Sequence, residues 1–442
     1  MTVIIKIIQL LLSLSILVIV HEFGHFILAR YFKTRVEKFY LFFDWPFALF
    51  KRKWGETEYG VGMIPLGGYV KISGMIDESM DREQMKQPPQ PYEFRSKKAW
   101  QRLLIMLGGV FFNFIFALLI YVAILSVWGE TYLPAANVKY GILTDSTGYA
   151  MGLRNGDKII SVDNQPVDNF YAIVPDILLN DRKVITVDRQ GTVVDVPIGR
   201  EFIPLLLKSP DAVLDARVPF GPFVVTDFSK DSPAQKAGLS LGDEIVALDN
   251  IEFAWYDEFQ GYLASHKGTP LTVTVRRDSG LVDFTVSPTE AGILGIFREA
   301  GSVLELSTKH YSFFQAIPAG ITKGWNTTKD YLKQFRLIFT KDTKAYESLG
   351  GFIAIGNIFP GSWNWQSFWN LTAFLSLILA VMNILPIPAL DGGHVMFLIF
   401  EVVTGRKPSD KFMEYAQIAG MVILFALLIF ANGNDILKLI RK

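Results

Sequence analysis

Long stretches without a charged side chain dominate the pattern of hydrophobic and polar positions along this chain. Leu103–Val127, Gln366–Leu390 and Tyr415–Asn434 contain none, and Ile7–Val20 extends to about Ala29 through a segment that does carry ionisable groups. A helix needs about 20 mainly apolar residues to cross the hydrocarbon core of a bilayer. The pattern therefore predicts about four transmembrane helices. The competing interpretation of each stretch is a buried helix of a soluble protein.

The first apolar stretch has the length of the hydrophobic core of a secretory signal peptide. Only Lys6 precedes it, however, and it runs directly into His21-Glu22-Phe23-Gly24-His25 without a small-residue cleavage site. We therefore interpret this stretch as a helix that is retained.

Charged residues divide unevenly between the segments that separate the apolar stretches. Residues 30–102 carry 14 basic and 9 acidic side chains, whereas residues 130–290 carry 14 basic and 23 acidic ones. Because Lys and Arg accumulate on the cytoplasmic side, this partition places 30–102 in the cytoplasm and both 130–290 and the N-terminus outside. The C-terminal tail should also lie outside, although Lys438, Arg441 and Lys442 oppose that assignment.

Residues 130–290 have the composition of a soluble segment and contain an internal repeat. Turn residues recur, and β-branched runs such as Lys183–Val187 and Leu271–Val275 predict strands. Thirteen residues starting at Gly152 align with thirteen starting at Gly238, with seven identities and an offset of 86 residues. An offset of this size indicates a duplicated domain rather than a solenoid.

Composition narrows the chemistry that this chain can perform. The 442 residues include 43 basic and 43 acidic ones, half of the residues are hydrophobic, and none is cysteine. The balanced charge argues against a nucleic-acid partner, and the apolar content excludes a disordered chain. Without cysteine there is no disulfide, thiolate metal site or cysteine nucleophile, so any metal must be held by histidine and carboxylate.

The end of the first apolar stretch carries a candidate metal site. His21 and His25 are four residues apart, so both imidazoles lie on one face of a helix and can bind one ion. Imidazole nitrogen suits zinc, and the carboxylate of Glu22 could take a proton from water without ligating the ion. Ionisable groups at membrane depth are costly and usually functional. The competing interpretation is a helix end that emerges at the interface with snorkelling polar side chains.

A tetrahedral zinc site needs a third protein ligand. Of the other histidines, His266 and His310 are expected at the surface, and His394 lies at the end of the third apolar stretch, where Asp391 is the better candidate. Asp391 follows the third apolar stretch, and Pro388 and Gly392-Gly393 should break the helix so that the carboxylate turns toward another helix. Coordination would remove the cost of burying it. We therefore favour Asp391, and the alternative is a loop aspartate that caps the next helix.

Topology provides an independent test of this choice. With alternating directions, the first and third spans both run from outside to inside. His21–His25 and Asp391 each follow the apolar part of such a span, so both motifs reach the same side of the membrane, as a shared metal requires.

The repeated pattern resembles a known domain. Ala-Gly-Leu-x-x-Gly-Asp-x-Ile, followed by a strand and Asp-Asn, resembles the PDZ domain of bacterial envelope proteases, in which a strand edge and a helix form a groove for an extended peptide. The second copy matches from Asp231 to Asn250, whereas the first has Ala150-Met151-Gly152 where the second has Ala237-Gly238. The two copies either bind peptide ends or act as spacers that screen the membrane site.

Together, these motifs resemble the site-2 protease family of intramembrane zinc metalloproteases. The resemblance covers nearly the whole chain, including Asn383-x-x-Pro-x-Pro-x-Leu-Asp391-Gly-Gly near its end. It implies a polytopic α-helical membrane protein with about four transmembrane helices, two inserted PDZ-like α/β domains and a membrane-associated β-hairpin. It further implies Zn²⁺ bound by His21, His25 and Asp391, with Glu22 as the general base.

The resemblance also implies a substrate-binding region. The residues that fit the family's segment beside the bound substrate are Asn383, Pro386 and Pro388. The family's Gly-x-x-Pro-Leu-Gly-Gly-Tyr-Val element is present as Gly62–Val70, which includes Gly67 and Gly68, and in the family it forms a membrane-dipping β-hairpin. An edge strand near Val61–Ile72 could pair with the backbone of an unwound substrate.

Membership would imply membrane-spanning protein substrates, such as an anti-sigma factor or remnant signal peptides, in contact with membrane lipid and without nucleic acid. The location would be the bacterial cytoplasmic (inner) membrane, with the PDZ-like domains on the extracytoplasmic side. These domains would exclude substrates with bulky external parts, which would order this cut after one by another protease.

The expected organisation has five parts. Residues 1–129 hold the first two spans and the hairpin loop, 130–210 the first PDZ-like domain, 211–292 the second, 293–362 an amphipathic interfacial segment, and 363–442 the last two spans.

Two functions of other classes compete with proteolysis. A non-catalytic receptor or scaffold with tandem PDZ domains predicts no metal and no effect of Glu22→Gln. A transporter with the intramembrane histidines and carboxylates as a proton relay predicts symmetry between the membrane halves, yet the repeat in this sequence lies in the soluble segment.

Overall fold

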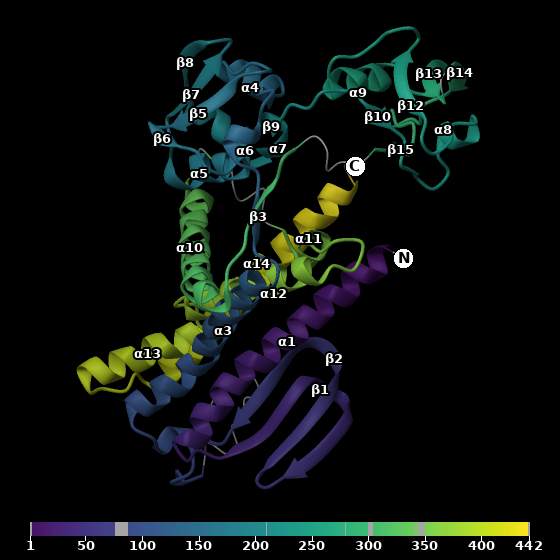
Figure 1. Cartoon of the computed structure of the whole chain (residues 1–442). Coiled ribbons are helices and arrows are strands. Elements are labelled where there is room, and N and C mark those ends of the chain that lie inside the picture. Colours follow the sequence, from purple (N-terminus) through teal and green to yellow (C-terminus); the bar gives the residue numbers. More distant parts are fainter. Residues whose placement is uncertain are drawn as a thin grey trace. The chain divides into compact units, whose positions relative to one another are not determined.

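The computed structural model describes residues 2–75, 87–208, 210–278, 280–298, 304–340, 343 and 350–440. The chain forms two compact units (Figure 1). Unit 1 comprises Met1–Gly129, His310–Arg336 and Tyr346–Lys442, and unit 2 comprises Glu130–Lys309 and Leu337–Ala345.

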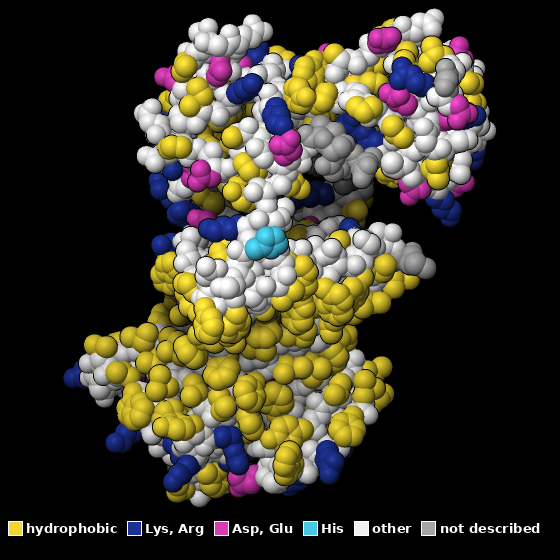
Figure 2. All heavy atoms as spheres, in the orientation of Figure 1, with side chains coloured by type: hydrophobic (Ala, Val, Ile, Leu, Met, Phe, Trp, Pro, Cys, Tyr) yellow, Lys and Arg dark blue, Asp and Glu magenta, His cyan; other side chains and the backbone are white. Residues whose placement is uncertain are grey.

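Four helices of unit 1, within the described residues, are long and apolar enough to cross a membrane. They are α1 (Thr2–Tyr31), α3 (Ala99–Val127), α12 (Trp365–Ile384) and α14 (Asp410–Ile440). Each contains most or all of one of the four uncharged stretches, so the prediction of four apolar helices is confirmed. Figure 2 shows the hydrophobic side chains of this unit as a broad band, with Lys and Arg side chains gathered at one end of it.

Helices α1 and α3 cross with their backbones in contact. A Cβ atom on Gly24 would lie 2.3 Å from the carbonyl oxygen of Gly108, and one on Gly108 would lie 2.5 Å from the carbonyl oxygen of Gly24. A larger side chain at either position would therefore separate the helices. Small residues at such crossings let helices associate in lipid, where apolar burial supplies little driving force.

Hydroxyl groups hold α12 against the same two helices. Thr372 donates to Ser13 Oγ at 3.0 Å, and Ser376 donates to the backbone carbonyl of Asn113 at 2.8 Å. All four of these residues are fully buried. An unpaired polar group in hydrocarbon costs several kcal/mol. These hydrogen bonds therefore fix the position of α12 along α1 and α3.

Helix α12 ends earlier than the uncharged stretch suggests. The sequence predicts a span up to Leu390, but α12 stops at Ile384 and the chain is irregular until α13 (Asp391–Thr404). Pro386 and Pro388 explain the difference, because proline lacks the backbone N–H that a helix needs and keeps the preceding residue out of the helical conformation. Asp391 therefore begins a new helix.

The two glycines after Asp391 act differently from expectation. Gly392 and Gly393 do not break a helix but lie in the first turn of α13. A Cβ atom on Gly392 would lie 2.0 Å from the carbonyl oxygen of Leu385, and one on Gly393 would lie 2.6 Å from Cα of Pro388. The glycines are needed because the loop folds back tightly against the helix.

Helices α10 (Phe313–Phe339) and α11 (Phe352–Ile358) lie in the segment expected to be amphipathic. Helix α10 is not among those apolar enough to span a membrane. Its small residues face α3, since a Cβ atom on Gly320 would lie 2.7 Å from the backbone nitrogen of Val122 and one on Gly324 would lie 2.4 Å from the Leu118 side chain. The amphipathic helix is therefore attached to a long apolar helix along one face.

The loop after α1 forms a small sheet from β1 (Val36–Trp54) and β2 (Thr57–Ile72). Both strands bend, so four segments lie side by side in the order 48–54, 57–62, 36–41 and 68–72. Val61 pairs with Leu41 on one side and Phe50 on the other, so it lies inside the sheet. The edge strand is therefore shorter than the expected Val61–Ile72. Only the last part of β2 is an edge beside α1.

Unit 2 contains two copies of a three-stranded antiparallel core, β5–β7–β8 and β12–β13–β14. The strands predicted at Lys183–Val187 and Leu271–Val275 are confirmed as β7 and β13. Each copy has its own cluster of buried hydrophobic side chains. Val213 and Ala216 belong to the first cluster, so the first copy continues beyond residue 210.

Both copies of unit 2 share the order strand, helix, strand, helix and two paired strands, to which the first copy adds β6, α6 and α7 and the second adds β11. The first copy contains β4 (Ile142–Leu143), α4 (Ser146–Met151), β5 (Lys158–Val162), β6 (Gln165–Pro166), α5 (Ile173–Asn180), β7 (Val184–Arg189), β8 (Thr192–Pro197), α6 (Ile203–Lys208), α7 (Pro210–Val213) and β9 (Asp215–Ala216). The second contains β10 (Phe223–Val224), β11 (Asp227–Phe228), α8 (Pro233–Lys236), β12 (Glu244–Leu248), α9 (Tyr256–Ser265), β13 (Leu271–Arg277), β14 (Gly280–Val286) and β15 (Ile296–Phe297). Strands β3 (Glu130–Tyr132) and β16 (Ser307–Lys309) pair where the chain enters and leaves the unit.

The identical residues of the repeat have structural causes. Gly152 and Gly238 have φ values of 103° and 104° after the first helix of their copies, a conformation that favours glycine. Asp157 and Asp243, the first aspartate of each copy, are buried and paired with Arg189 and Arg277. In the second copy, Arg277 donates from Nε and from a terminal nitrogen to Asp243 at 2.7 Å each. These contacts hold the start of β12 to the end of β13.

The Arg277–Asp243 pair should make the stability of the second copy depend on pH. The hydrogen bond from Arg277 holds the pKa of Asp243 below its ordinary value. The contribution of the Arg277–Asp243 pair to the stability of the second copy is therefore complete above about pH 4, the pKa of an aspartate in an unfolded chain. This contribution is lost as the pH falls through the lower pKa of Asp243 in the folded state. In wild type, the protection of β13 amides from hydrogen exchange, corrected for intrinsic rates, should decrease as the pH is lowered.

Asp243→Asn should lower that protection at pH 7 by about tenfold or more and flatten its dependence on acid, because the charged hydrogen bonds are already gone. Asp278→Asn, which changes an exposed carboxylate in the next turn, is the matched control and should behave as wild type. Equal protection in Asp243→Asn and wild type at pH 7 would contradict this role.

Candidate metal centre

The two histidines of the first apolar helix face α3. His21 and His25 lie one turn apart, with ring centroids separated by 4.9 Å. Gly109 of α3 makes room for them, because a Cβ atom there would lie 2.5 Å from both Cε1 of His21 and Nε2 of His25. The contact of Gly24 with Gly108 thus places both imidazoles against a helix surface that has no side chain at this point.

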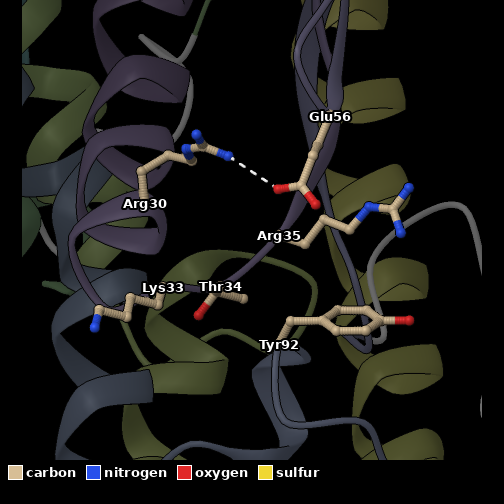
Figure 3. Close-up of a pocket in the computed structure, with 6 residues that line it drawn as sticks. All are labelled: Arg30, Lys33, Thr34, Arg35, Glu56 and Tyr92. Atoms are coloured by element: carbon tan, nitrogen blue, oxygen red, sulfur yellow. Dashed lines mark hydrogen bonds and ion pairs between the residues drawn. The ribbon is translucent and has the colours of Figure 1, made fainter.

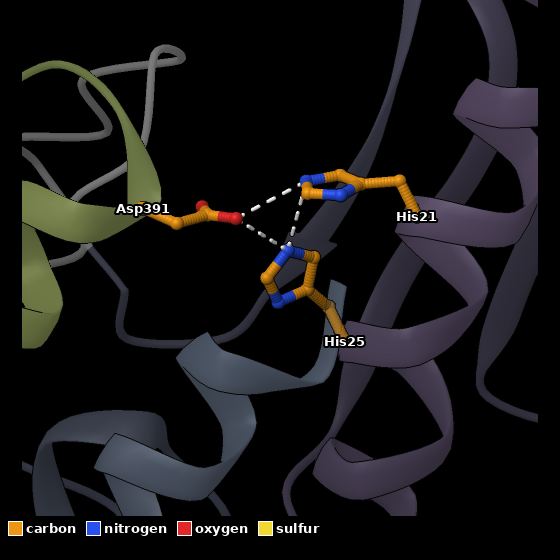
Figure 4. Close-up of side chains that lie close together, drawn as sticks. All are labelled: His21, His25 and Asp391. Atoms are coloured by element: carbon orange, nitrogen blue, oxygen red, sulfur yellow. Dashed lines mark hydrogen bonds and ion pairs between the residues drawn. The ribbon is translucent and has the colours of Figure 1, made fainter. Parts of the chain in front are cut away.

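The start of α13 brings the third group to the histidine pair (Figure 4). Oδ2 of Asp391 lies 3.1 Å from Nε2 of His21 and 3.1 Å from Nε2 of His25, and the two nitrogens are 3.3 Å apart. The three side chains are 12%, 7% and 17% exposed. Leu390, not Asp391, is the cap residue of α13, and it makes no side-chain cap. The geometry thus differs from that of a capping aspartate.

The outer nitrogen of His25 is held by the backbone. Its Nδ1 lies 2.8 Å from the carbonyl oxygen of Ile105, which can only accept a hydrogen bond. In the neutral ring that binds a metal, the proton is therefore on Nδ1, and the lone pair of Nε2 points toward His21 and Asp391. Ligating histidines are commonly oriented by such an acceptor.

Asn113 plays the corresponding part for His21. Its side-chain nitrogen Nδ2 lies 3.2 Å from Nδ1 of His21, the residue is fully buried, and Oδ1 has no partner among the described residues. With the amide oxygen turned to the ring, Nδ1–H of His21 would donate to it, the oxygen would gain a partner, and Nε2 would again be free. Sequence reasoning missed Asn113, although an amide within the uncharged stretch was a visible signal.

The donor set fits a zinc ion. One ligand atom from each of His21, His25 and Asp391 lies within 4.8 Å of the others, and this is the one such group among the described residues. Ligands at tetrahedral positions around zinc, with bonds of about 2.0–2.1 Å, are about 3.3 Å apart. The observed separations of 3.1–3.3 Å match that spacing. Two imidazoles and one carboxylate also leave a fourth position for water or substrate.

The remaining residues predicted for the site lie on α1, at the end of α12, in the loop that follows α12, and on β2. Glu22 follows His21 on α1 and is partly buried, and Asn383 is in the last turn of α12, two residues before the loop that contains Pro386 and Pro388. Gly68 at the edge of β2 packs on α1, since a Cβ atom there would lie 2.7 Å from Cγ1 of Val18. The neighbouring Gly67 has a φ of 153°. The sheet edge therefore reaches α1 one turn before His21.

The other three histidines lie apart from the metal group. His394, on α13, lies 2.9 Å from the side-chain nitrogen of Gln417. His266 stacks on Tyr262, and His310 is exposed. The structure thus brings together the three residues that the sequence selected from a small set of candidates.

Long apolar helices with a buried His-His-carboxylate group define a membrane-embedded, metal-dependent hydrolase as the class of this protein. A model of peptidase family M50 matches residues 9–427, and the chain belongs to that family. It is a zinc metalloprotease and a multi-pass bacterial membrane protein.

Relatives of this chain match along nearly their whole length. The regulator of sigma-E protease RseP of Salmonella typhimurium is 29% identical, over 97% of this chain and 98% of its own. The regulator of sigma E protease of Haemophilus influenzae is 27% identical, with the same coverage. A protein of Neisseria meningitidis whose given name contains the words zinc metalloprotease is also 27% identical, over 97% and 98% of the two chains.

Gly109 should be essential for metal binding because it leaves room for both imidazoles. Gly109→Val places carbon atoms where the rings lie, so the purified protein should bind zinc at least about tenfold more weakly. Gly433→Val is the control, since nothing lies within 4 Å of the position of its Cβ atom. Zinc is measured by competition with a chelator of known affinity. Equal zinc affinity in Gly109→Val and wild type would contradict the described packing.

Asn113 should act on the metal through His21. Asn113→Ala removes the acceptor for Nδ1–H, so zinc affinity should fall by about 10–100-fold. Asn113→Asp retains an acceptor and should keep most of the affinity, which distinguishes an orienting bond from simple packing. Asn370→Ala, which removes a side-chain amide from α12 rather than from α3, serves as the control. If the alanine and aspartate variants lose zinc equally, the orienting role is wrong.

Proposed function

We propose that this metalloprotease hydrolyses peptide bonds within membrane-spanning segments of other proteins. The observation that carries the proposal is the position of His21, His25 and Asp391 at the contact of long apolar helices. A site for soluble substrates has no reason to lie there, because burying polar groups at membrane depth is expensive. The relatives whose names describe them as regulators of a sigma factor support the same proposal.

In this proposal His21, His25 and Asp391 hold the zinc ion and Glu22 is the general base. Zinc, when bound, would supply the Lewis acidity that polarises a peptide carbonyl and makes water nucleophilic near neutral pH. Glu22 follows His21 directly and takes the proton of the attacking water, then passes it to the leaving nitrogen. Asn113 and the carbonyl of Ile105 keep the imidazoles oriented throughout.

A transmembrane helix hides its peptide bonds within its own hydrogen bonds, so the substrate must unwind before it can be cut. The edge of β2 at residues 68–72 could receive the released backbone as an added strand, with Gly67 and Gly68 permitting close approach. Asn383 would hold the substrate backbone or stabilise the oxyanion, and Pro386 and Pro388 would shape the adjoining loop. What supports this arrangement is the contact of Gly68 with α1 near the histidine pair.

The sheet is also suited to contact with lipid. Large apolar side chains on it are exposed, among them Trp45 at 73%, Leu49 at 63% and Trp54 at 82%. A cluster of this kind is typical of surfaces that enter the membrane interface. We therefore propose that β1 and β2 form a membrane-associated hairpin beside the entry of the substrate.

The two repeated copies of unit 2 are proposed to be PDZ-like domains on the extracytoplasmic side of the inner membrane. The excess of acidic residues over 130–290 and the basic excess over 30–102 support this orientation. Acting as a size filter, these domains would admit substrates already shortened by another protease. An anti-sigma factor or remnant signal peptides fit that description.

Two competing functions remain distinguishable from proteolysis. A tandem-PDZ receptor without activity requires neither zinc nor Glu22. A transporter would use the same polar groups to carry protons rather than to hold a metal. The fit of the three ligand atoms to zinc favours the protease.

Glu22→Gln separates proteolysis from these alternatives. Because the amide cannot take a proton from water, cleavage of a model transmembrane substrate by reconstituted protein should fall by about 10²–10⁴-fold. Zinc content should stay near that of wild type, since Glu22 is not a ligand. Glu252→Gln, an exposed position in unit 2, should cleave normally. Unchanged cleavage by Glu22→Gln, or purified wild type that binds no zinc, would sink the proposal.

A further inference from the structure

A pocket at the end of α1 lies outside the metal centre, and three of its six lining residues are cations. Its volume is about 240 Å³, and the residues that line it are Arg30, Lys33, Thr34, Arg35, Glu56 and Tyr92 (Figure 3). These residues come from three places, namely the segment from α1 to β1, the turn between β1 and β2, and the loop before α3. The three cations and one carboxylate leave an excess of positive charge.

Two buried donors of this pocket lack an acceptor. Thr34 is 1% exposed, and neither its hydroxyl nor Nε of Arg35 has a hydrogen-bond partner among the residues that the structure describes. An arginine Nε–H can only donate, so an acceptor from outside those residues would satisfy it. Buried donors without acceptors are costly, which points to a bound group at this place.

The walls of the pocket are held by backbone contacts. The amide of Arg35 donates to the carbonyl of Tyr92 at 3.0 Å, and the carbonyl of Arg35 accepts from Ser73 at 3.0 Å. The guanidinium lies 5.7 Å from the centre of the Tyr92 ring (Figure 3). Arg30 pairs with Glu56 at 3.5 Å, and both side chains are about half exposed, so this ion pair is weak and can yield to a ligand.

Cations at the end of a helix can also serve only to complement its last carbonyls. Here that need is already met in part, because the amide of Thr34 donates to the carbonyl of Ala29 at 2.8 Å and Lys97 donates to the carbonyl of Lys33 at 3.1 Å. If the cations served only to complement the helix end, the Thr34 hydroxyl and Nε of Arg35 would still have no acceptor among the described residues. A ligand with several negatively charged oxygens satisfies both.

The pocket lies where α1 leaves the apolar band. Arg30 is nine residues after His21, about 14 Å along the helix. The neighbouring Tyr31 is 76% exposed, and Trp100 is 47% exposed and packs on Phe32 with ring centroids 5.4 Å apart. Exposed tyrosine and tryptophan are typical of the boundary between lipid and water. The anion available at that boundary is a phospholipid headgroup.

We propose that this pocket binds the phosphate of an anionic membrane phospholipid. Arg35 and the hydroxyl of Thr34 donate to the phosphate oxygens, and Arg30 and Lys33 add positive charge. Guanidinium groups suit phosphate because they present donors in a fork. Basic pockets beside membrane helices are typical headgroup sites. A bound headgroup fixes the depth of α1 in the bilayer, and with it the depth of the histidine pair.

The test uses the full-length protein, stripped of lipid in detergent, and native mass spectrometry. Phosphatidylglycerol should bind about tenfold more tightly than phosphatidylcholine with the same acyl chains. Arg35→Gln should remove most of this preference, and Thr34→Val should weaken phosphatidylglycerol binding about fivefold. Arg52→Gln removes the same charge from an exposed position on β1 and should retain the preference.

Thr34→Val also tests whether a loss of lipid binding results from misfolding. It replaces a buried hydroxyl that bonds to none of the described residues, so without lipid its unfolding temperature should equal or exceed that of wild type. Equal binding of the two lipids would overturn the proposal, and so would an equal loss in Arg35→Gln and Arg52→Gln. If inorganic phosphate binds the wild-type pocket as tightly as phosphatidylglycerol does, and Arg35→Gln abolishes this, the pocket serves free phosphate and the lipid proposal fails.

Discussion

The contact of Gly24 with Gly108 is the constraint on which the rest of the membrane unit depends. With no side chain on either residue, α1 and α3 meet backbone to backbone, and the two histidines that flank Gly24 on its helix are pressed against α3. Gly109 then leaves space for the imidazoles, and the carbonyl of Ile105 and the amide of Asn113 reach their outer nitrogens. A wider crossing would leave the same residues present but unable to form a site.

The third ligand depends on a second set of contacts. Asp391 opens α13 because the proline-containing loop ends α12 early, and the glycines after it allow the loop and helix to touch. Helix α13 is tied to α3 by Arg102 and Glu401, whose charged atoms are 2.5 Å apart and whose side chains are 11% and 16% exposed. A buried pair of this kind is costly to break. The link therefore connects the helix that carries Asp391 to the helix that supports His21 and His25.

Much of this arrangement could be predicted from the sequence, for identifiable reasons. Apolar helices can be recognised from the absence of charged residues, and two histidines four residues apart share a face wherever a helix forms. A chain without cysteine also offers few other metal ligands. Asn113 was within reach of the same reasoning. The early end of α12, the role of Gly392 and Gly393 and the narrowing of the sheet edge were not, because each results from contact between segments distant in the sequence. The burial of the Thr34 hydroxyl without a partner among the described residues could likewise be seen only in the folded chain, where three segments surround it.

Zinc K-edge X-ray absorption of the purified full-length protein tests the central claim most directly. The described site predicts one zinc per chain with two imidazoles and otherwise oxygen ligands, at about 2.0–2.1 Å. His21→Ala should leave the signal of a single imidazole in whatever zinc is still bound. A zinc shell with three imidazoles, or one that is unchanged in His21→Ala, would contradict the assignment of His21, His25 and Asp391 as the metal-binding group.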